Sequence, residues 1–269
     1  MIGTSHHHPG FASRFVEPRN VDVWLPPGYS PNRPDRFPVL YMHDGQNLFE
    51  PHLSYIGVDW EMDEAMTRLI GEKKIREAIV VGIWNTPRRV REYMPFKAAS
   101  QFAPRDQAAQ FLNEIGGDLL SDEYLKFMVT ELKPFIDTCY TTLPGPQDTF
   151  IMGSSMGGLI SLYAICEYPH VFGGAGCIST HWPIGAGCML DYMKQGLPSP
   201  QDHRIYFDHG TTTLDAEYAP FQQRADRVME EAGYNREQNW ITRIFEGAEH
   251  SERAWRERVH VPLQFLLQA

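Results

Sequence analysis

Cysteine is scarce in this sequence, and long apolar runs are missing. The 269 residues include four cysteines, none in a Cys-X-X-Cys pair: Cys139, Cys166, Cys177 and Cys188. This number and spacing favour neither a zinc ribbon nor a disulfide scaffold, so we expect free thiols and a reducing, cytoplasmic compartment. No stretch approaches the roughly 20 consecutive apolar residues that span a bilayer. We predict neither membrane insertion nor a retained export signal, while a signal removed earlier would leave no trace.

Positive charge is also in short supply. Lys and Arg number 24 against 34 Asp and Glu, which gives a formal net charge of −10. Such a charge argues against nucleic acid as a partner, because little of the surface is suited to neutralising phosphates. The three histidines at 6–8 would need further ligands at fixed spacing to hold a metal, so we predict no metal site. We expect residues 1–20 to form an irregular N-terminal segment.

Short apolar runs alternate with amphipathic stretches along the chain. The apolar runs are bounded by Pro, Gly or polar residues and predict strands at 21–25, 39–42, 78–83, 149–152, 174–179, 204–207 and 240–245. Helical spacing of apolar residues predicts helices at 60–70, 107–115, 124–140, 159–168, 217–232 and 251–267. The first strand alternates apolar with polar residues and is expected to be antiparallel.

This alternation predicts an α/β fold class. We expect a mostly parallel central sheet with helices on both faces and with ligands at the carboxyl ends of the strands. No repeat, linker or charge block divides the chain, so a single domain over 1–269 is expected. The irregular stretch 85–117 predicts an insertion near the functional site, and the short segment 181–203 predicts a small cap or none.

A Gly-X-Ser-X-Gly pattern at 153–157 carries the main chemical signal. It lies between a predicted strand and a predicted helix, as a nucleophile elbow does, and its glycines permit a turn tight enough to hold a serine hydroxyl clear of the sheet. The start of the following helix would direct free amide groups and a positive dipole at a developing oxyanion. Ser155 is therefore the candidate nucleophile, and a plain glycine-rich turn is the alternative interpretation.

A serine nucleophile needs a base, and in this arrangement the partners follow in the order Ser, Asp or Glu, His. His250 is the only later histidine in a loop between the last predicted strand and the closing helix; the others are His170, His181, His203, His209 and His260. The acid is expected after the strand at 204–207, where Asp208 and Asp215 are candidates. Asp215 is favoured because its longer loop can turn a carboxylate toward the imidazole, but Asp208 stays open.

Five segments, in this order, resemble the putative-esterase (esterase D-like) family of α/β hydrolases, which includes feruloyl and acetyl-xylan esterases, enterochelin-type esterases and mycolyltransferases: 43–49, 91–95, 153–158, 210–215 and 247–250. The resemblance covers nearly the whole chain from about residue 21. It implies an α/β-hydrolase fold with Ser155 as nucleophile, Asp215 as acid and His250 as base. It also implies that the backbone N–H groups of Met156 and Gln46 form the oxyanion hole.

Further residues are candidates for substrate binding, and each has a plainer alternative. Aromatic side chains at strand ends could stack on a sugar or an aromatic acyl group, or belong to the core. Arginines at 88, 89 and 91 could bind an anionic group, or pair with carboxylates. The candidates are Asp44, Trp84, Arg91, Tyr93, His181 and Trp182. The chain departs from many family members at 98–117 and 180–182, and we expect these segments to shape the substrate pocket.

Together these features predict a serine carboxylic-ester hydrolase that works through an acyl-enzyme without a metal or an organic cofactor. The expected substrates are small-molecule or oligosaccharide esters, with acetyl or aromatic acyl groups on carbohydrates. An acyltransferase or a siderophore-ester hydrolase could use the same triad. A non-catalytic ligand-binding module on this fold is the alternative from another class. The acyl group, the alcohol and the oligomeric state stay open, a homo-oligomer included.

Overall fold

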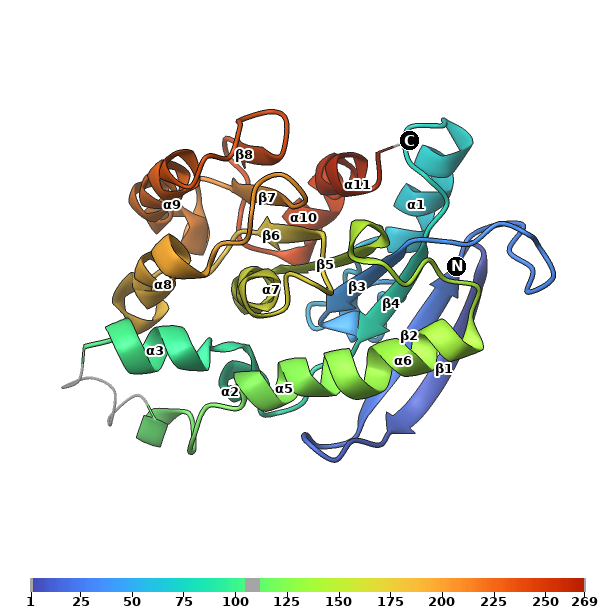
Figure 1. Cartoon of the computed structure of the whole chain (residues 1–269), viewed down its shortest axis with the longest axis horizontal. Helices are drawn as coiled ribbons and strands as arrows, with labels where there is room; N and C mark the ends of the chain where they lie inside the picture. The colour runs from blue at the N-terminus through green and yellow to red at the C-terminus, as the bar shows by residue number, and fades with distance from the viewer. Residues whose placement is uncertain (1, 105–111, 269) are drawn as a thin grey trace.

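A computed structural model describes residues 2–104 and 112–268 of the chain. Its centre is an eight-stranded sheet with the order β1-β2-β4-β3-β5-β6-β7-β8 (Figure 1). The strands are β1 Thr4–Phe11, β2 Arg19–Leu25, β3 Val39–His43, β4 Ile79–Ile83, β5 Thr149–Ser154, β6 Gly174–Ile178, β7 Arg204–His209 and β8 Trp240–Ile244. β1 and β2 pair antiparallel, as do β2 and β4. All other neighbours pair parallel, which confirms the predicted mostly parallel sheet.

Helices cover both faces of the sheet, as predicted. They are α1 Met62–Gly71, α2 Arg89–Tyr93, α3 Phe96–Phe102, α5 Ser121–Phe127, α6 Lys133–Cys139, α7 Met156–Glu167, α8 Cys188–Gly196, α9 Ala219–Glu231, α10 Glu252–Arg258 and α11 His260–Leu266. Figure 1 shows α1 and α11 on one side of the sheet and α5, α6 and α7 on the other. No helix among residues 2–104 and 112–268 is long and apolar enough to cross a bilayer.

Alternate residues of the strands supply the two halves of the core. Leu40 and Met42 of β3 pack into the cluster that contains α1, α10 and α11. Val39 and Tyr41 pack into the larger cluster on the other face, with α5, α7, α8 and α9. Strands buried on both faces read as continuous apolar runs, which is why the central strands were readable in the sequence.

The N-terminal segment corrects one prediction. Residues 1–20 were expected to be irregular, but residues 4–11 form β1, the edge strand next to β2. Most of its side chains are exposed, so it carries no apolar pattern that would identify it. Tertiary contacts stabilise it instead: His6 Nδ1 lies 3.2 Å and His8 Nε2 2.9 Å from the hydroxyl of Tyr140. Pro9 is tolerated because an edge strand leaves some N–H positions unpaired.

Helix boundaries differ from the prediction in three places. The helix expected at 124–140 is divided by a π-helical turn at 128–132, just before Pro134. The closing helix breaks at Val259, three residues before Pro262, because proline has no N–H for the helical hydrogen bond. The irregular stretch 85–117 contains α2 and α3, and 181–203 contains α8, which the sequence did not reveal. Residues 107–111 of the helix expected at 107–115 lie outside the described residues.

Candidate active site

Ser155 lies at a sharp turn between β5 and α7. Its backbone has φ 56° and ψ −121°, a strained conformation for a residue with a side chain. The turn closes only because its neighbours are glycines: a Cβ added to Gly153 would lie 2.8 Å from the backbone carbonyl carbon of Gly157. This strand, turn and helix have the backbone geometry of a nucleophile elbow, as the sequence pattern predicted.

A second turn faces the elbow. Directly after β3, Asp44 adopts a left-handed conformation and residues 45–47 form a 3-10 turn. Gly45 packs on β4 so closely that a Cβ there would lie 2.4 Å from the carbonyl carbon of Gly82. Gln46 of this turn and Ser155 line the same cavity. Met156 begins α7, whose first N–H groups have no acceptor within the helix. The predicted oxyanion donors therefore lie beside the serine, Gln46 on the turn after β3 and Met156 at the start of α7.

His250 and Asp215 form a short, buried pair. His250 Nδ1 lies 2.6 Å from Asp215 Oδ1, with 9% and 0% of the two side chains exposed. The imidazole lies edge-on to the Trp255 ring at a centroid distance of 4.9 Å. His250 lines the cavity that contains Ser155. The imidazole thus contacts a carboxylate through Nδ1 and also packs against an indole.

The surroundings of Asp215 favour its ionised form. Burial opposes ionisation, but hydrogen bonds from His250, Ser179 and Gly210 outweigh it and lower the pKa of this carboxyl. The Ser179 hydroxyl and the Gly210 N–H both donate to Oδ2 at 2.6 Å, which leaves Oδ1 for the imidazole. A carboxylate held in this way fixes the ring orientation and the tautomer of a histidine.

Asp208, the alternative acid, has no direct hydrogen bond to His250 among the described contacts and is linked to Asp215 through Arg258 and Ser179. It accepts hydrogen bonds from Arg258 at 3.1 Å and from the Tyr206 hydroxyl at 2.9 Å. Burial raises the pKa of Asp208 in spite of these donors. Arg258 also donates to the Ser179 hydroxyl at 2.8 Å, so Asp208 supports the group that holds Asp215. The geometry therefore favours Asp215 as the partner of His250.

The loops that carry the acid and the histidine are joined by backbone hydrogen bonds. The N–H groups of Thr211 and Thr212 both donate to the Ala248 carbonyl at 3.1 Å. The N–H of His250 donates to the Thr213 hydroxyl at 2.8 Å. The positions of the carboxylate and the imidazole are therefore fixed by one loop pair at the carboxyl ends of β7 and β8.

The cavity around Ser155 and His250 has a volume of about 550 Å³. One wall is an ion pair: Arg89 donates through Nε and Nη2 to the two oxygens of Asp44, each at 2.7 Å. Asn85 Nδ2 donates to the same carboxylate at 2.6 Å. Burial opposes ionisation of Asp44, but Arg89 and Asn85 outweigh it and lower its pKa. Asp44 therefore both lines the cavity and braces its own turn.

The other predicted binding residues lie around this cavity rather than in its wall. Trp84 lines a neighbouring cavity, and Tyr93 is fully buried against His43. Trp182 is 1% exposed and donates through Nε1 to Gln222, so it belongs to the core. Its burial argues against the stacking role considered for it. For Trp182 the structure favours the alternative considered from the sequence, that an aromatic side chain at a strand end belongs to the core.

His181 and Arg91 are also held by protein contacts. His181 Nδ1 lies 2.7 Å from the Tyr218 hydroxyl. Burial lowers the pKa of His181 to about 4, and the charges of His250 and Arg89 act in the same direction. Arg91 donates from Nε to the Asp118 carbonyl at 2.7 Å. Of the three arginines considered from the sequence, Arg89 is the one that lines the cavity.

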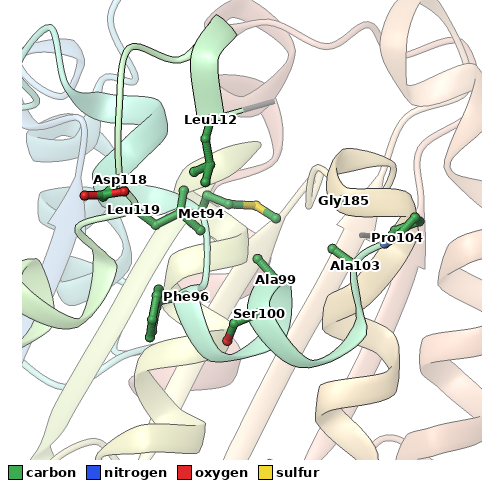
Figure 2. A pocket seen from close by; sticks show the side chains of 10 residues that line it. All are labelled: Met94, Phe96, Ala99, Ser100, Ala103, Pro104, Leu112, Asp118, Leu119 and Gly185. Atoms are coloured by element: carbon green, nitrogen blue, oxygen red, sulfur yellow. The ribbon is translucent and has the colours of Figure 1, made fainter. Parts of the chain in front are cut away.

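The insertion borders a different, apolar cavity, shown in Figure 2. Its lining includes Phe96, Ala99 and Ser100 of α3 together with Leu112, Leu119 and Gly185. Within the described ranges 2–104 and 112–268, the wall around Ser155 contains no residue between 90 and 153. An influence of the insertion on the Ser155 cavity, as expected from the sequence, stays a prediction.

Ser179 is the residue that sequence reasoning missed. It follows β6 with φ 41°, donates to Asp215 and accepts from Trp255 Nε1 at 3.1 Å. Its only sequence signal was its place as the last residue of the strand predicted at 174–179, which ends at Ile178 in the structure. Among the described residues, no three His, Cys, Asp or Glu side chains converge as ligands for a metal.

The fold and the site together define an α/β hydrolase with a serine at its elbow. Residues 12–265 match the family described as "Putative esterase". The chain therefore belongs to this family, which confirms the family predicted from the sequence motifs.

Three known proteins illustrate the likeness. The Bacillus subtilis protein YbbA is 30% identical over 183 residues, which cover 68% of this chain and 62% of YbbA. A ferulic acid esterase structure aligns with a TM-score of 0.70 at 18% identity and covers 98% of both chains. The enterobactin esterase FES from Shigella flexneri aligns with a TM-score of 0.68 at 18% identity, over 97% of this chain and 59% of that one. At this identity the structural likeness shows the fold.

Proposed function

We propose that this protein is a serine carboxylic-ester hydrolase with Ser155, His250 and Asp215 as its catalytic triad. The observation that carries the proposal is the 2.6 Å contact between His250 and Asp215 beside the cavity that contains Ser155. Membership of the putative esterase family supports the same chemistry. The match of that family to residues 12–265 also supports our inference that residues 1–269 act as a single domain.

In the proposed reaction, the Ser155 hydroxyl attacks the ester carbonyl carbon while His250 Nε2 takes its proton. The carbonyl oxygen becomes an oxyanion, which the N–H groups of Met156 and Gln46 would stabilise. The tetrahedral intermediate collapses, the C–O bond to the alcohol breaks, and His250 gives the proton to the departing oxygen. Water, activated by the same imidazole, then cleaves the acyl-enzyme and releases the acid.

Asp215 would make this proton transfer efficient. Its contact with Nδ1 keeps the proton on that nitrogen, so Nε2 is left with a free lone pair. When the ring becomes an imidazolium, the nearby negative charge stabilises it. The histidine must be neutral to act as the base.

The proposed substrates are acetyl or aromatic acyl esters of carbohydrates. The likeness to a ferulic acid esterase supports an aromatic acyl group. The likeness to an enterobactin esterase keeps siderophore esters as a second candidate. An acyltransferase would share the acyl-enzyme and differ only in the acceptor.

A hydrolysis panel tests the proposal. We would compare methyl acetate, methyl butyrate, methyl ferulate, acetylated and feruloylated oligosaccharides and a siderophore trilactone, with product analysis in the presence of a free sugar acceptor. We expect the protein to hydrolyse at least one of these carboxylic esters and to release the free acid. Transfer to the sugar in preference to water would make the protein an acyltransferase. Absence of both turnover and an acyl burst with every ester would favour a non-catalytic binding module.

A further inference from the structure

A second cavity lies beside the one that contains Ser155. It has a volume of about 440 Å³, and its wall is built from β1, β2, the turn after β3 and the end of β4. Its lining residues are Ser5, His7, Asp22, Gly45, Gln46, Phe49, Glu50, Leu53 and Trp84. None of the triad residues belongs to it.

The two cavities share a wall. Gln46 lines both of them, and its Oε1 accepts the N–H of Asn85 at 3.2 Å. Two successive residues after β4 line different cavities: Trp84 lines the second cavity and Asn85 lines the one that contains Ser155. The loop after the turn also contributes to both, through Leu53 on one side and Tyr55 on the other. The two cavities are therefore neighbours that lie on either side of Gln46.

The second cavity combines an indole with a carboxylate. Asp22 accepts from Trp84 Nε1 at 2.5 Å and lies 2.6 Å from His7 Nδ1. The Asp22 side chain is 13% exposed, so an oxygen lone pair can still reach the cavity, while His7 is 48% exposed. An aromatic ring with neighbouring hydrogen-bond acceptors suits a sugar, which has apolar C–H groups and hydroxyl donors.

The charge of this cavity narrows the class of ligand. Asp22 and Glu50 are both acidic, and the described lining contains no Lys or Arg side chain; its basic side chain is His7, which lies 2.6 Å from Asp22. A carboxylate or another anionic group would be repelled by these oxygens. A neutral polyhydroxylated ring would instead donate hydrogen bonds to them.

We propose that the second cavity is a sugar subsite, which holds the carbohydrate part of an ester while its acyl carbonyl lies at Ser155. The inference rests on the proposed esterase function and deepens it, because it names the residues that select the alcohol. Trp84, Asp22 and His7 are the residues that contact the sugar. Gln46 lies at the crossing point between the acyl group and the sugar.

The test compares two esters with the same acyl group. Methyl ferulate places nothing larger than a methyl group beyond the scissile bond, whereas a feruloylated arabino-oligosaccharide extends into the second cavity. For the unchanged protein we expect kcat/KM to favour the sugar ester at least tenfold. Trp84→Ala should reduce this preference by about tenfold, mainly through KM of the sugar ester, and Asp22→Asn by a smaller factor. Ile244→Ala, an exposed residue on the opposite edge strand, should leave the preference unchanged.

A binding measurement separates this inference from the esterase proposal. In the Ser155→Ala background, titration calorimetry with the unesterified arabino-oligosaccharide should show binding that Trp84→Ala removes. Equal hydrolysis of the two esters by the unchanged protein, or equal losses for both in Trp84→Ala, would overturn the sugar subsite and leave the esterase intact. Hydrolysis of neither ester, together with retained oligosaccharide binding, would overturn the esterase proposal and keep the subsite.

Discussion

At the scale of single residues, the site depends on a buried chain of hydrogen bonds behind the histidine. Asp215 contacts His250 directly, whereas Asp208 reaches the site through Arg258 and Ser179. Two aspartates that were close alternatives in the sequence therefore have different roles in the structure. One orients the imidazole and the other positions the groups around its partner.

The two aspartates should respond differently to amidation. Asp215→Asn should lower kcat by about 10⁴-fold, because an amide can stabilise the wrong tautomer of the histidine. Asp208→Asn should lower kcat less than tenfold and reduce the free energy of unfolding by about 1–3 kcal/mol, because it weakens a buried contact with Arg258. Steady-state kinetics and denaturant unfolding of both variants check this. The reverse order of the kcat losses would give the acid role to Asp208.

His43 should make stability depend on pH. Burial lowers its pKa to about 3 from the ordinary value of 6.5. Between these values the unfolded chain binds a proton that the folded protein does not, so the free energy of unfolding falls as pH drops. The slope from this group is about 1.4 kcal/mol per pH unit for one proton.

The change that tests this is His43→Asn, which keeps a polar group near the Tyr124 hydroxyl, 2.8 Å from His43 Nδ1 in the structure. We expect the variant to be less stable at pH 7 and to lose stability less steeply between pH 6 and 4, by about 1.4 kcal/mol per unit. Urea unfolding across this pH range is the measurement. Parallel curves for the two proteins would show that His43 titrates normally.

At the scale of elements, two turns at the carboxyl ends of the sheet set the geometry of the site. The elbow after β5 was readable in the sequence because its glycine spacing is specific and its flanking strand and helix are apolar. The sequence gives a weaker signal for the turn after β3, where Gln46 was predicted mainly from the family resemblance. The signal is weak because the turn needs a glycine for a tertiary reason: Gly45 lies against the backbone of β4, which is distant in sequence.

Gly45→Ala should therefore displace the turn that carries Gln46. We expect kcat to fall by about 10²–10³-fold, the loss typical of one missing oxyanion donor, with a smaller change in KM. Gly71→Ala is a matched control, because a Cβ at Gly71 meets nothing within 4 Å. Ester hydrolysis by both variants checks this. Normal kcat in a folded Gly45→Ala protein would argue against a role for this turn in catalysis.

At the scale of the whole molecule, the sequence predicts the parallel core well and its margins less well. Central strands are apolar on both faces, so a continuous run identifies them. The edge strand β1 has exposed side chains and depends on contacts with Tyr140, more than 130 positions away. Trp182 looked suited to stacking on a substrate, but tertiary packing places it against Phe207. Such long-range contacts leave no local pattern.

The same limit applies to the site. Ser155, Asp215 and His250 could be selected as candidates from the sequence because each follows a strand that the sequence predicts. Ser179 and the shared wall at Gln46 depend on how loops from separate strands meet. The two cavities on either side of Gln46 are therefore the part of the molecule for which the structure adds most.

Turnover of a methyl ester by Ser155→Ala tests most directly whether Ser155 is the nucleophile. We expect this variant to keep its circular dichroism spectrum and melting temperature, because the hydroxyl lies at a turn and packs no core. Hydrolysis should fall by several orders of magnitude, to the residual rate that the oxyanion donors supply. Turnover near that of the unchanged protein, in a folded variant, would contradict the assignment of Ser155 as the nucleophile.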